Sequence, residues 1–242
     1  MVGPEPSVVS ERILGMASST VQIGIALLVL RYEGVRLRDL GLSPQLLAPA
    51  MVAVGGVVLV LNGVVAGLTI LGGTEVSVGV QSVPPNYSSF EIAVSGVYFY
   101  LFVGPAEELV FRGYLQNKLT ALFEGGNDRT RRALGVVTAA VTFSLLHVPV
   151  IVLVGGVQLR EMSGILLMLI FSGITFGTVY ELTRNLYLVA FLHGIGDLWP
   201  LFVDPGSSAW PNWGVIFACY ALLVLLYRQW ATGTSRSPLE AT

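Results

Sequence analysis

The sequence predicts an all-α membrane protein: a bundle of about seven transmembrane helices (six to eight) forming a single integral-membrane domain over residues 1–242. Three observations support this fold class. Of the 242 residues, 54% are hydrophobic and only 12% are charged, about half the charged share of ordinary soluble domains. The mean hydropathy is +0.75. Apolar runs of about 20 residues, the length needed to cross a bilayer, recur along the chain.

Seven segments reach this length. They are 11–31, 47–71, 89–119, 132–154, 162–183, 186–203 and 212–229. Gly104-Pro105 interrupts the third, which predicts either a kinked helix or two short pieces. Only a tight turn at Arg184-Asn185 separates the fifth from the sixth, so we expect these two to form a helical hairpin. Residues 35–46 suit a short segment at the membrane interface.

The placement of lysine and arginine predicts the orientation. With the N-terminus outside and the spans alternating, the inner loops hold most of the chain's 13 lysine and arginine residues, and the outer segments hold only Arg12 and Arg160. Cytoplasmic loops carry such an excess of positive charge. We therefore expect a multi-pass protein of the cell membrane, in contact with membrane lipids. The absence of basic runs argues against nucleic acid as a partner.

Ionisable side chains inside a span cost roughly 3 kcal/mol or more, so they mark functional sites. The third, fourth and sixth spans contain such residues. They are Glu107, Glu108, Arg112, His147, His193 and Asp197, and the two histidines are the only ones in the chain. If these side chains serve one site, the three spans must pack together, and we predict that contact.

The two adjacent glutamates have different surroundings on a helix. Glu108 and Arg112 are four residues apart, so they share a face and can pair, either as a structural ion pair or as part of a site. Glu107 is rotated from Glu108 by about 100° and lacks that partner. If Pro105 begins a helical segment, Glu107 lies in its first turn, where free N–H groups favour a carboxylate. In a wet pocket, that carboxylate can act as a general base.

Each histidine has a notable neighbour one helical turn away. Phe143 precedes His147 by four residues and is expected to wall its imidazole, with core packing as the alternative. Asp197 follows His193 by four residues and would orient it or share a ligand with it.

These residues resemble the CAAX protease and bacteriocin-processing family, also called the Abi or CPBP family, which includes the Ras-converting prenyl endopeptidases. The motifs that match are Glu107-Glu108-x-x-x-Arg112, Phe143-x-x-x-His147 and His193-x-x-x-Asp197, in that order within residues 104–199, the expected catalytic core. The stretch from Pro105 to Gly113 resembles the first family motif throughout.

The charge bias predicts that the active site is open to the cytoplasm. The resemblance implies an intramembrane endopeptidase, whose cavity among the helices would suit a hydrophobic, lipidated or membrane-associated peptide or protein. It implies that Glu107 and His147 activate the water, that Glu108 and Arg112 hold the geometry, and that His193 and Asp197 stabilise the oxyanion. Phe143 is the expected substrate contact. We expect a glutamate mechanism without a cofactor. The alternative is a zinc ion on Glu107, His147 and His193, with water as the fourth ligand.

One residue departs from the prenyl-protein branch, which has asparagine where this chain has Asp197. An ionised aspartate cannot donate a hydrogen bond to an oxyanion, so Asp197 is protonated, orients His193 or helps to hold a metal.

Three other functions are alternatives to a peptidase of this family. The same residues would suit a non-catalytic family member that acts as a membrane binding or immunity partner, or a proton-coupled transporter. Gly194-Ile195-Gly196-Asp197 also matches the Gly-x-Gly-Asp signature of intramembrane aspartyl proteases. That chemistry needs a second aspartate nearby, and the other aspartates fall in predicted loops.

Overall fold

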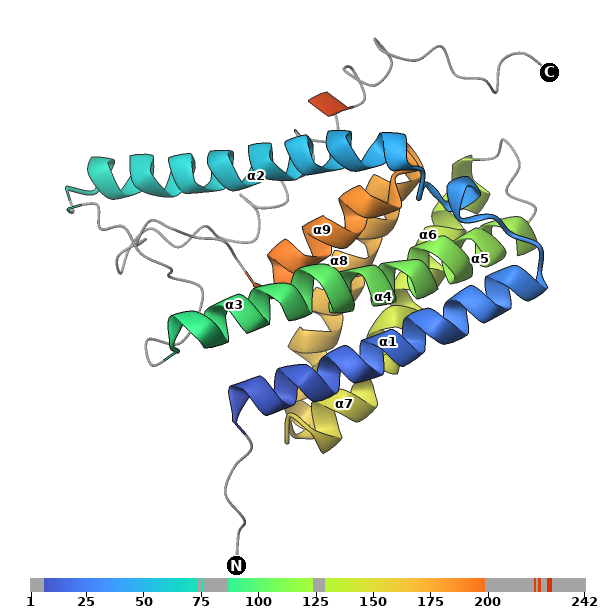
Figure 1. The fold of residues 1–242 in the computed structure, drawn as a ribbon, viewed down its shortest axis with the longest axis horizontal. Coiled ribbons are helices and arrows are strands. Elements are labelled where there is room, and N and C mark those ends of the chain that lie inside the picture. The colour runs from blue at the N-terminus through green and yellow to red at the C-terminus, as the bar shows by residue number, and fades with distance from the viewer. Residues whose placement is uncertain are drawn as a thin grey trace, which may run out of the picture.

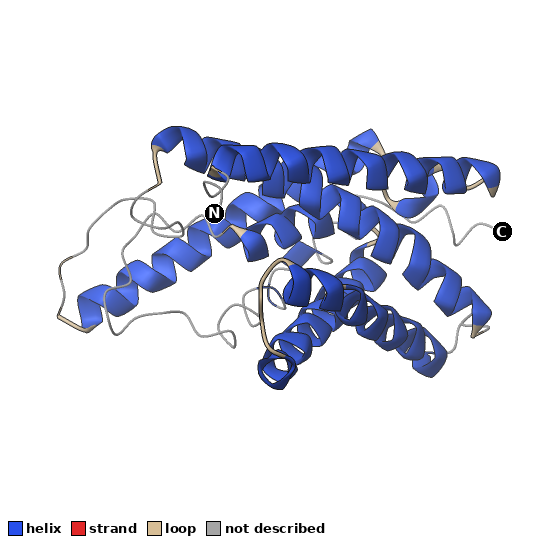
Figure 2. Cartoon of the chain, turned by 90° about the horizontal axis from the view of Figure 1, so that it is seen from below, coloured by secondary structure: helices blue, strands red, loops and turns tan. Residues whose placement is uncertain are grey.

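The structure, a computed structural model, describes residues 7–73, 75, 87–123, 129–198, 220, 222, 226 and 227. Every element among these residues is a helix, which confirms the all-α class (Figure 2). The α-helices are α1 (Val8–Tyr32), α2 (Pro44–Leu71), α3 (Ser89–Tyr98), α4 (Gly104–Glu108), α5 (Asn117–Leu122), α6 (Arg129–Leu146), α7 (Val148–Leu153), α8 (Met162–Thr183) and α9 (Leu186–Asp197). The 3₁₀ helices are η1 (Leu37–Leu40) and η4 (Leu159–Glu161), and the π-helical segments are η2 (Phe99–Val103) and η3 (Leu109–Gln116).

Five stretches of the described chain are long and apolar enough to cross a membrane. They are Val8–Tyr32, Leu37–Leu71, Ser89–Leu122, Arg129–Leu153 and Met162–Thr183, and they correspond to the first five predicted spans. Most of their surface is exposed and apolar, with Leu28 at 69% and Leu59 at 75% exposed, as lipid contact requires. The chain is therefore a multi-pass membrane protein.

The last two predicted spans are described only in part. The sixth, 186–203, contains the 12-residue apolar helix α9, and its end lies outside the described residues. The seventh, 212–229, lies outside the described residues except at four positions. The count of seven spans and the outside N-terminus therefore stay predictions.

The third span is one helix of changing pitch rather than two pieces. α3, η2, α4, η3 and α5 follow one another without a break from Ser89 to Leu122 (Figure 1). Pro105 lies inside this helix, directly after the η2 segment, and the residue before α4, Val103, is itself helical. The widened π turn accommodates a residue that cannot donate an N–H. Pro105 therefore does not begin a new helix, and the expected free N-terminus beside Glu107 is not formed.

The fourth span contains a break that the sequence analysis did not anticipate. α6 ends at Leu146 and α7 begins at Val148, so His147 occupies the turn between them. Pro149 explains the break, because proline cannot donate an N–H to the helical ladder and restricts the residue before it. The break exposes the carbonyl oxygen of Phe143, which accepts a hydrogen bond from the His147 ring at 2.7 Å.

The hairpin predicted at Arg184-Asn185 is confirmed. α8 ends at Thr183 and α9 begins at Leu186. Arg184 adopts the left-handed conformation, and the Asn185 side chain caps α9 by accepting from the Leu188 N–H. The Leu186 N–H donates to the Gly41 carbonyl at 3.3 Å, which fixes the start of α9 against the segment before α2.

The helices pack so that α4 lies at the centre of the bundle. α1 runs beside the long third span, α9 crosses it behind, and α6 packs along α8 (Figure 1). Gly104 on α4 permits the closest approach, because a Cβ atom there would lie 2.3 Å from the Ala190 carbonyl oxygen of α9. Glu108 and His193 each lie about one turn from this contact on their own helix, and their side chains are hydrogen-bonded at 2.6 Å.

Candidate active site

Three separated segments converge at the centre of the bundle. α4 supplies Glu107 and Glu108, the turn after α6 supplies His147, and α9 supplies His193 and Asp197. Their side chains lie within 3.6 Å of one another in a connected chain of contacts. The predicted contact between the third, fourth and sixth spans is confirmed.

The inner part of this cluster is a buried ion-pair network. Glu108 Oε1 accepts from Arg112 Nη1 at 2.9 Å and from His193 Nδ1 at 2.6 Å. The Glu108 side chain is 0% exposed and that of Arg112 is 2% exposed. Arg112 Nη2 also donates to the Gly173 carbonyl of α8 at 3.2 Å. The predicted Glu108–Arg112 pair is confirmed, and the structure adds His193 to it. Such a network holds its members in one geometry.

Glu107 faces both histidines from the accessible side of the cluster. Its Oε2 lies 3.6 Å from His147 Nε2 and 3.6 Å from His193 Nε2. These separations slightly exceed hydrogen-bond length, and a water that bridges the three atoms would bind beside them, on the open side of the cluster, rather than between them. The Glu107 and His147 side chains are 21% and 25% exposed, so water can reach them.

The hydrogen bonds fix which nitrogen of each imidazole points into the site. His147 Nδ1 bonds to the Phe143 carbonyl, which only accepts, so Nδ1 carries the proton and Nε2 faces Glu107. His193 Nδ1 donates to the Glu108 carboxylate, which leaves Nε2 toward Glu107 and Asp197. Both histidines therefore direct Nε2 at the same small volume.

Asp197 lies on the open side of His193. Its Oδ2 is 3.5 Å from His193 Nε2, the nitrogen that also faces Glu107. The opposite ring nitrogen is held by Glu108. Glu108 thus holds the Nδ1 side of the ring while Asp197 lies at the Nε2 side, and the orienting role expected for Asp197 stays a prediction.

Two phenylalanines enclose the charged groups. Phe143 packs its ring 4.4 Å from the His147 ring and 4.9 Å from the Arg112 guanidinium, so it walls the imidazole as predicted. Phe176 of α8 stacks on His193 at 5.3 Å and 18°. The sequence gives no indication of Phe176, because an apolar residue in an apolar span carries no signal. Aromatic faces over cationic groups stabilise them where water is excluded.

A groove of about 460 Å³ opens from Glu107 and His147. Its other lining residues come from α1, from the long helix and from the α6–α7 region: Gln22, Ile25, Ala26, Val29, Val110, Phe111, Tyr114, Leu146 and Val150. Phe143 is only 3% exposed and lies beneath this groove, whereas Phe111 lines it. The walls are mostly apolar, so the groove suits an apolar chain.

The wall that α1 contributes is tied to the long helix at one end. Lys118 pairs with Glu33 at 2.5 Å, and the Tyr114 hydroxyl donates to Glu33 at 2.9 Å. The hydrogen bond from the Lys118 ammonium, followed by that from Tyr114, lowers the pKa of the Glu33 carboxyl below its ordinary value.

The donor types at the site suit zinc, since Glu107, His147 and His193 supply oxygen and imidazole nitrogen. Among the described residues, no group of three or more His, Cys, Asp or Glu side chains is placed to hold a metal ion.

Comparison with known families bears on the same segment. Residues 89–199 match the family model described as type II CAAX prenyl endopeptidase Rce1-like. The matched segment runs from the start of α3 past the end of α9 and contains every residue of the cluster. No curated protein and no solved structure matches the chain.

Proposed function

We propose, from the match of residues 89–199 to the type II CAAX prenyl endopeptidase Rce1-like family model, that this chain is an intramembrane endopeptidase of the glutamate type. The observation that carries the proposal is the position of Glu107 Oε2, 3.6 Å from the Nε2 atoms of both His147 and His193, on a water-accessible groove. A general base must lie close to the groups that position the water, and water and substrate must be able to reach it.

In the proposed reaction, Glu107 takes a proton from the bridging water while His147 orients it. The water oxygen attacks the carbonyl carbon of the scissile peptide bond. The oxyanion that forms is stabilised by His193 in its imidazolium form, in which Nδ1–H donates to Glu108 and Nε2–H donates to the oxyanion, with Asp197 beside it. The Glu107 carboxyl, now protonated, delivers that proton to the leaving nitrogen. Glu108 and Arg112 do not touch substrate in this scheme, and they fix the imidazole of His193.

The proposed substrate is a hydrophobic or lipidated peptide held in the groove beside α1. The apolar walls, and a position about midway along the Ser89–Leu122 span, support a substrate that enters from the membrane. The family's action on prenylated proteins supports a lipidated C-terminal peptide as the first candidate. The positive inner loops support a site that is open to the cytoplasm.

The test compares wild type with Glu107→Gln, each purified in detergent, on a farnesylated C-terminal peptide, with the products identified by mass spectrometry. Glu161→Gln is the matched control, because Glu161 is an exposed carboxylate outside the cluster. We expect wild type and Glu161→Gln to release one defined C-terminal fragment, and Glu107→Gln to lose at least about 10³-fold in rate, because a general base contributes on the order of 10²–10⁴.

A rate for Glu107→Gln equal to wild type would remove Glu107 from the mechanism. Binding of the peptide without cleavage by wild type would favour the non-catalytic partner. Equal cleavage of the peptide without its lipid would refute the lipidated substrate while keeping the peptidase.

A further inference from the structure

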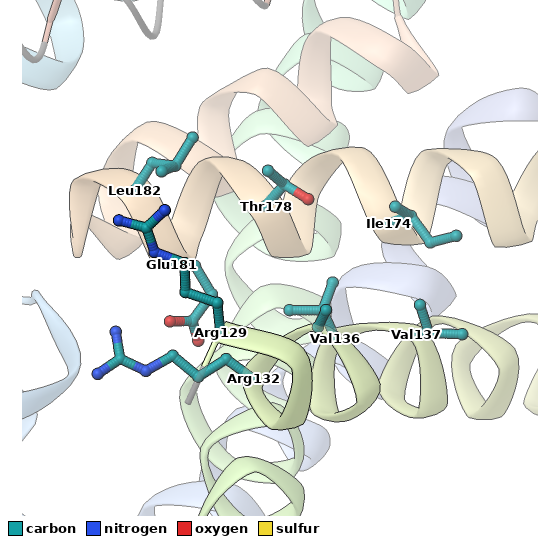
Figure 3. Close-up of a pocket in the computed structure, with 9 residues that line it drawn as sticks. Arg129, Arg132, Val136, Val137, Ile174, Thr178, Glu181 and Leu182 are labelled. Atoms are coloured by element: carbon teal, nitrogen blue, oxygen red, sulfur yellow. The ribbon is translucent and has the colours of Figure 1, made fainter. Parts of the chain in front are cut away.

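A second groove lies between α6 and α8, on the far side of α8 from the imidazole of His193. It encloses about 620 Å³ (Figure 3). Its lining residues are Arg129, Arg132, Ala133, Val136, Val137, Ile174, Thr178, Glu181 and Leu182. None of them belongs to the candidate active site.

The groove has a charged end and an apolar length. α6 and α8 run antiparallel, so Arg129 near the start of α6 lies opposite Leu182 near the end of α8, while Val137 lies opposite Ile174 (Figure 3). Val137 lies eight positions beyond Arg129, which is about 12 Å along the helix axis. Both helices belong to candidate spans, so a groove that runs from the start of α6 toward its middle would run from the membrane surface into the hydrocarbon region.

The charge at the open end is positive. Arg129 and Arg132 line this end together with Glu181, whose two oxygens already accept from Gln116 and from Arg184, so Arg129 is not needed to satisfy them. Within the described part of the chain, Arg129 has no ion-pair partner. The N-terminal end of the 18-residue helix α6 adds partial positive charge at the same place.

An occupant must therefore combine an anionic head with an apolar chain. Basic pockets between transmembrane helices on the cytoplasmic side suit anionic headgroups. We propose that this groove binds an anionic phospholipid, with its phosphate against Arg129 and Arg132 and an acyl chain along Val136, Val137 and Ile174.

The position of the groove connects such a lipid to the active-site framework. The carbonyls of Gly173 and Gly177 on α8 accept from Arg112 and Gln116 of the long helix. Gln116 also bonds to Glu181, which lines the groove. A lipid that spans α6 and α8 stabilises the helix pair against which Arg112 is held.

The test measures lipid binding to the purified protein in detergent by native mass spectrometry, and it does not require peptidase activity. Phosphatidylglycerol is titrated against phosphatidylcholine. The variant is Arg129→Gln/Arg132→Gln, and the matched control is Arg36→Gln/Arg38→Gln, which removes the same charge from two arginines whose side chains are each 64% exposed outside the groove. We expect wild type and the control pair to retain phosphatidylglycerol preferentially, and the groove variant to bind it about 30-fold more weakly.

Two further measurements test whether the acyl chain contributes to binding and whether the phosphate must belong to a lipid. Ile174→Trp fills the apolar path without changing charge and should also reduce retention of the lipid. Glycerophosphoglycerol, the same headgroup without acyl chains, should neither bind nor displace the lipid.

Three outcomes would overturn the proposal. One is equal retention by the groove variant and wild type. Another is an equal loss in the Arg36/Arg38 control pair, which would indicate diffuse surface charge. The third is binding of the free headgroup with the lipid's affinity, which would indicate a soluble anion site. Because none of these readouts is catalytic, a failure of the proposed function would leave the result interpretable.

Discussion

At the scale of single residues, adjacent glutamates on one helix have opposite environments. Glu108 is fully buried and accepts from Arg112 and His193, whereas Glu107 lines a groove and lies 3.6 Å from the imidazoles of His147 and His193. The rotation of about 100° between successive helical residues produces this division. The buried residue holds the site, and the accessible one is positioned to react.

The buried network predicts a specific stability pattern. Glu108→Gln leaves the Arg112 guanidinium buried without its countercharge, and breaking a buried pair costs about 3–5 kcal/mol. We expect the thermal unfolding midpoint of the purified protein to fall by about 10 °C. Glu108→Gln/Arg112→Met removes both charges and should recover most of that loss, yet stay inactive because His193 has lost its partner. A double variant as unstable as the single one would show that the pair is not a unit.

The sequence predicted part of this network, for a physical reason. Glu108 and Arg112 are one turn apart, so helix geometry alone pairs them. His193 is 85 residues from Glu108, and no local rule reports such a contact. Phe176 stacks on His193 but looks like any other apolar residue of its span.

At the scale of elements, close helix contacts position the site. Gly104 lets α4 approach α9, because any Cβ there would lie 2.3 Å from a backbone oxygen. Gly96 lies on the same helical rod, and a Cβ there would meet only a leucine methyl group at 4.0 Å.

These two glycines give a matched pair of variants. Glycine to alanine normally stabilises a helix by about 1 kcal/mol, so Gly96→Ala should preserve stability and activity. Gly104→Ala should push α4 from α9, lower the unfolding midpoint and reduce the cleavage rate by at least about tenfold, since a misplacement of about 1 Å can cost on the order of 10². Thermal shift and initial rates are measured on both. Unchanged values for Gly104→Ala would mean that the contact does not set the geometry.

The positions of the membrane-spanning helices were easier to predict than the local changes of pitch within them. Hydrophobic runs located the first five spans, since length and composition suffice for that. The π segments on both sides of α4 depend on packing, and a run of hydrophobic residues does not indicate them. The break at His147 did have a signal, namely Pro149 two residues later.

At the scale of the whole molecule, the predicted orientation rests on charge alone. The prediction puts the loop between α1 and α2 inside and the α7–η4 connection outside. Arg36→Cys and Gln158→Cys report on these two places, each in a Cys219→Ser background that removes the chain's single cysteine. A membrane-impermeant maleimide should label Gln158→Cys in intact spheroplasts and Arg36→Cys only after lysis. The reverse pattern would invert the molecule and the side from which substrate reaches Glu107.

The measurement that tests the central claim most directly is the cleavage rate of a farnesylated peptide by wild type with and without a zinc chelator, beside Glu107→Gln. A glutamate peptidase predicts that the chelator leaves the wild-type rate unchanged and that Glu107→Gln is inactive under both conditions. Loss of wild-type activity with the chelator, restored by added zinc, would contradict the account and assign the activation of water to a metal.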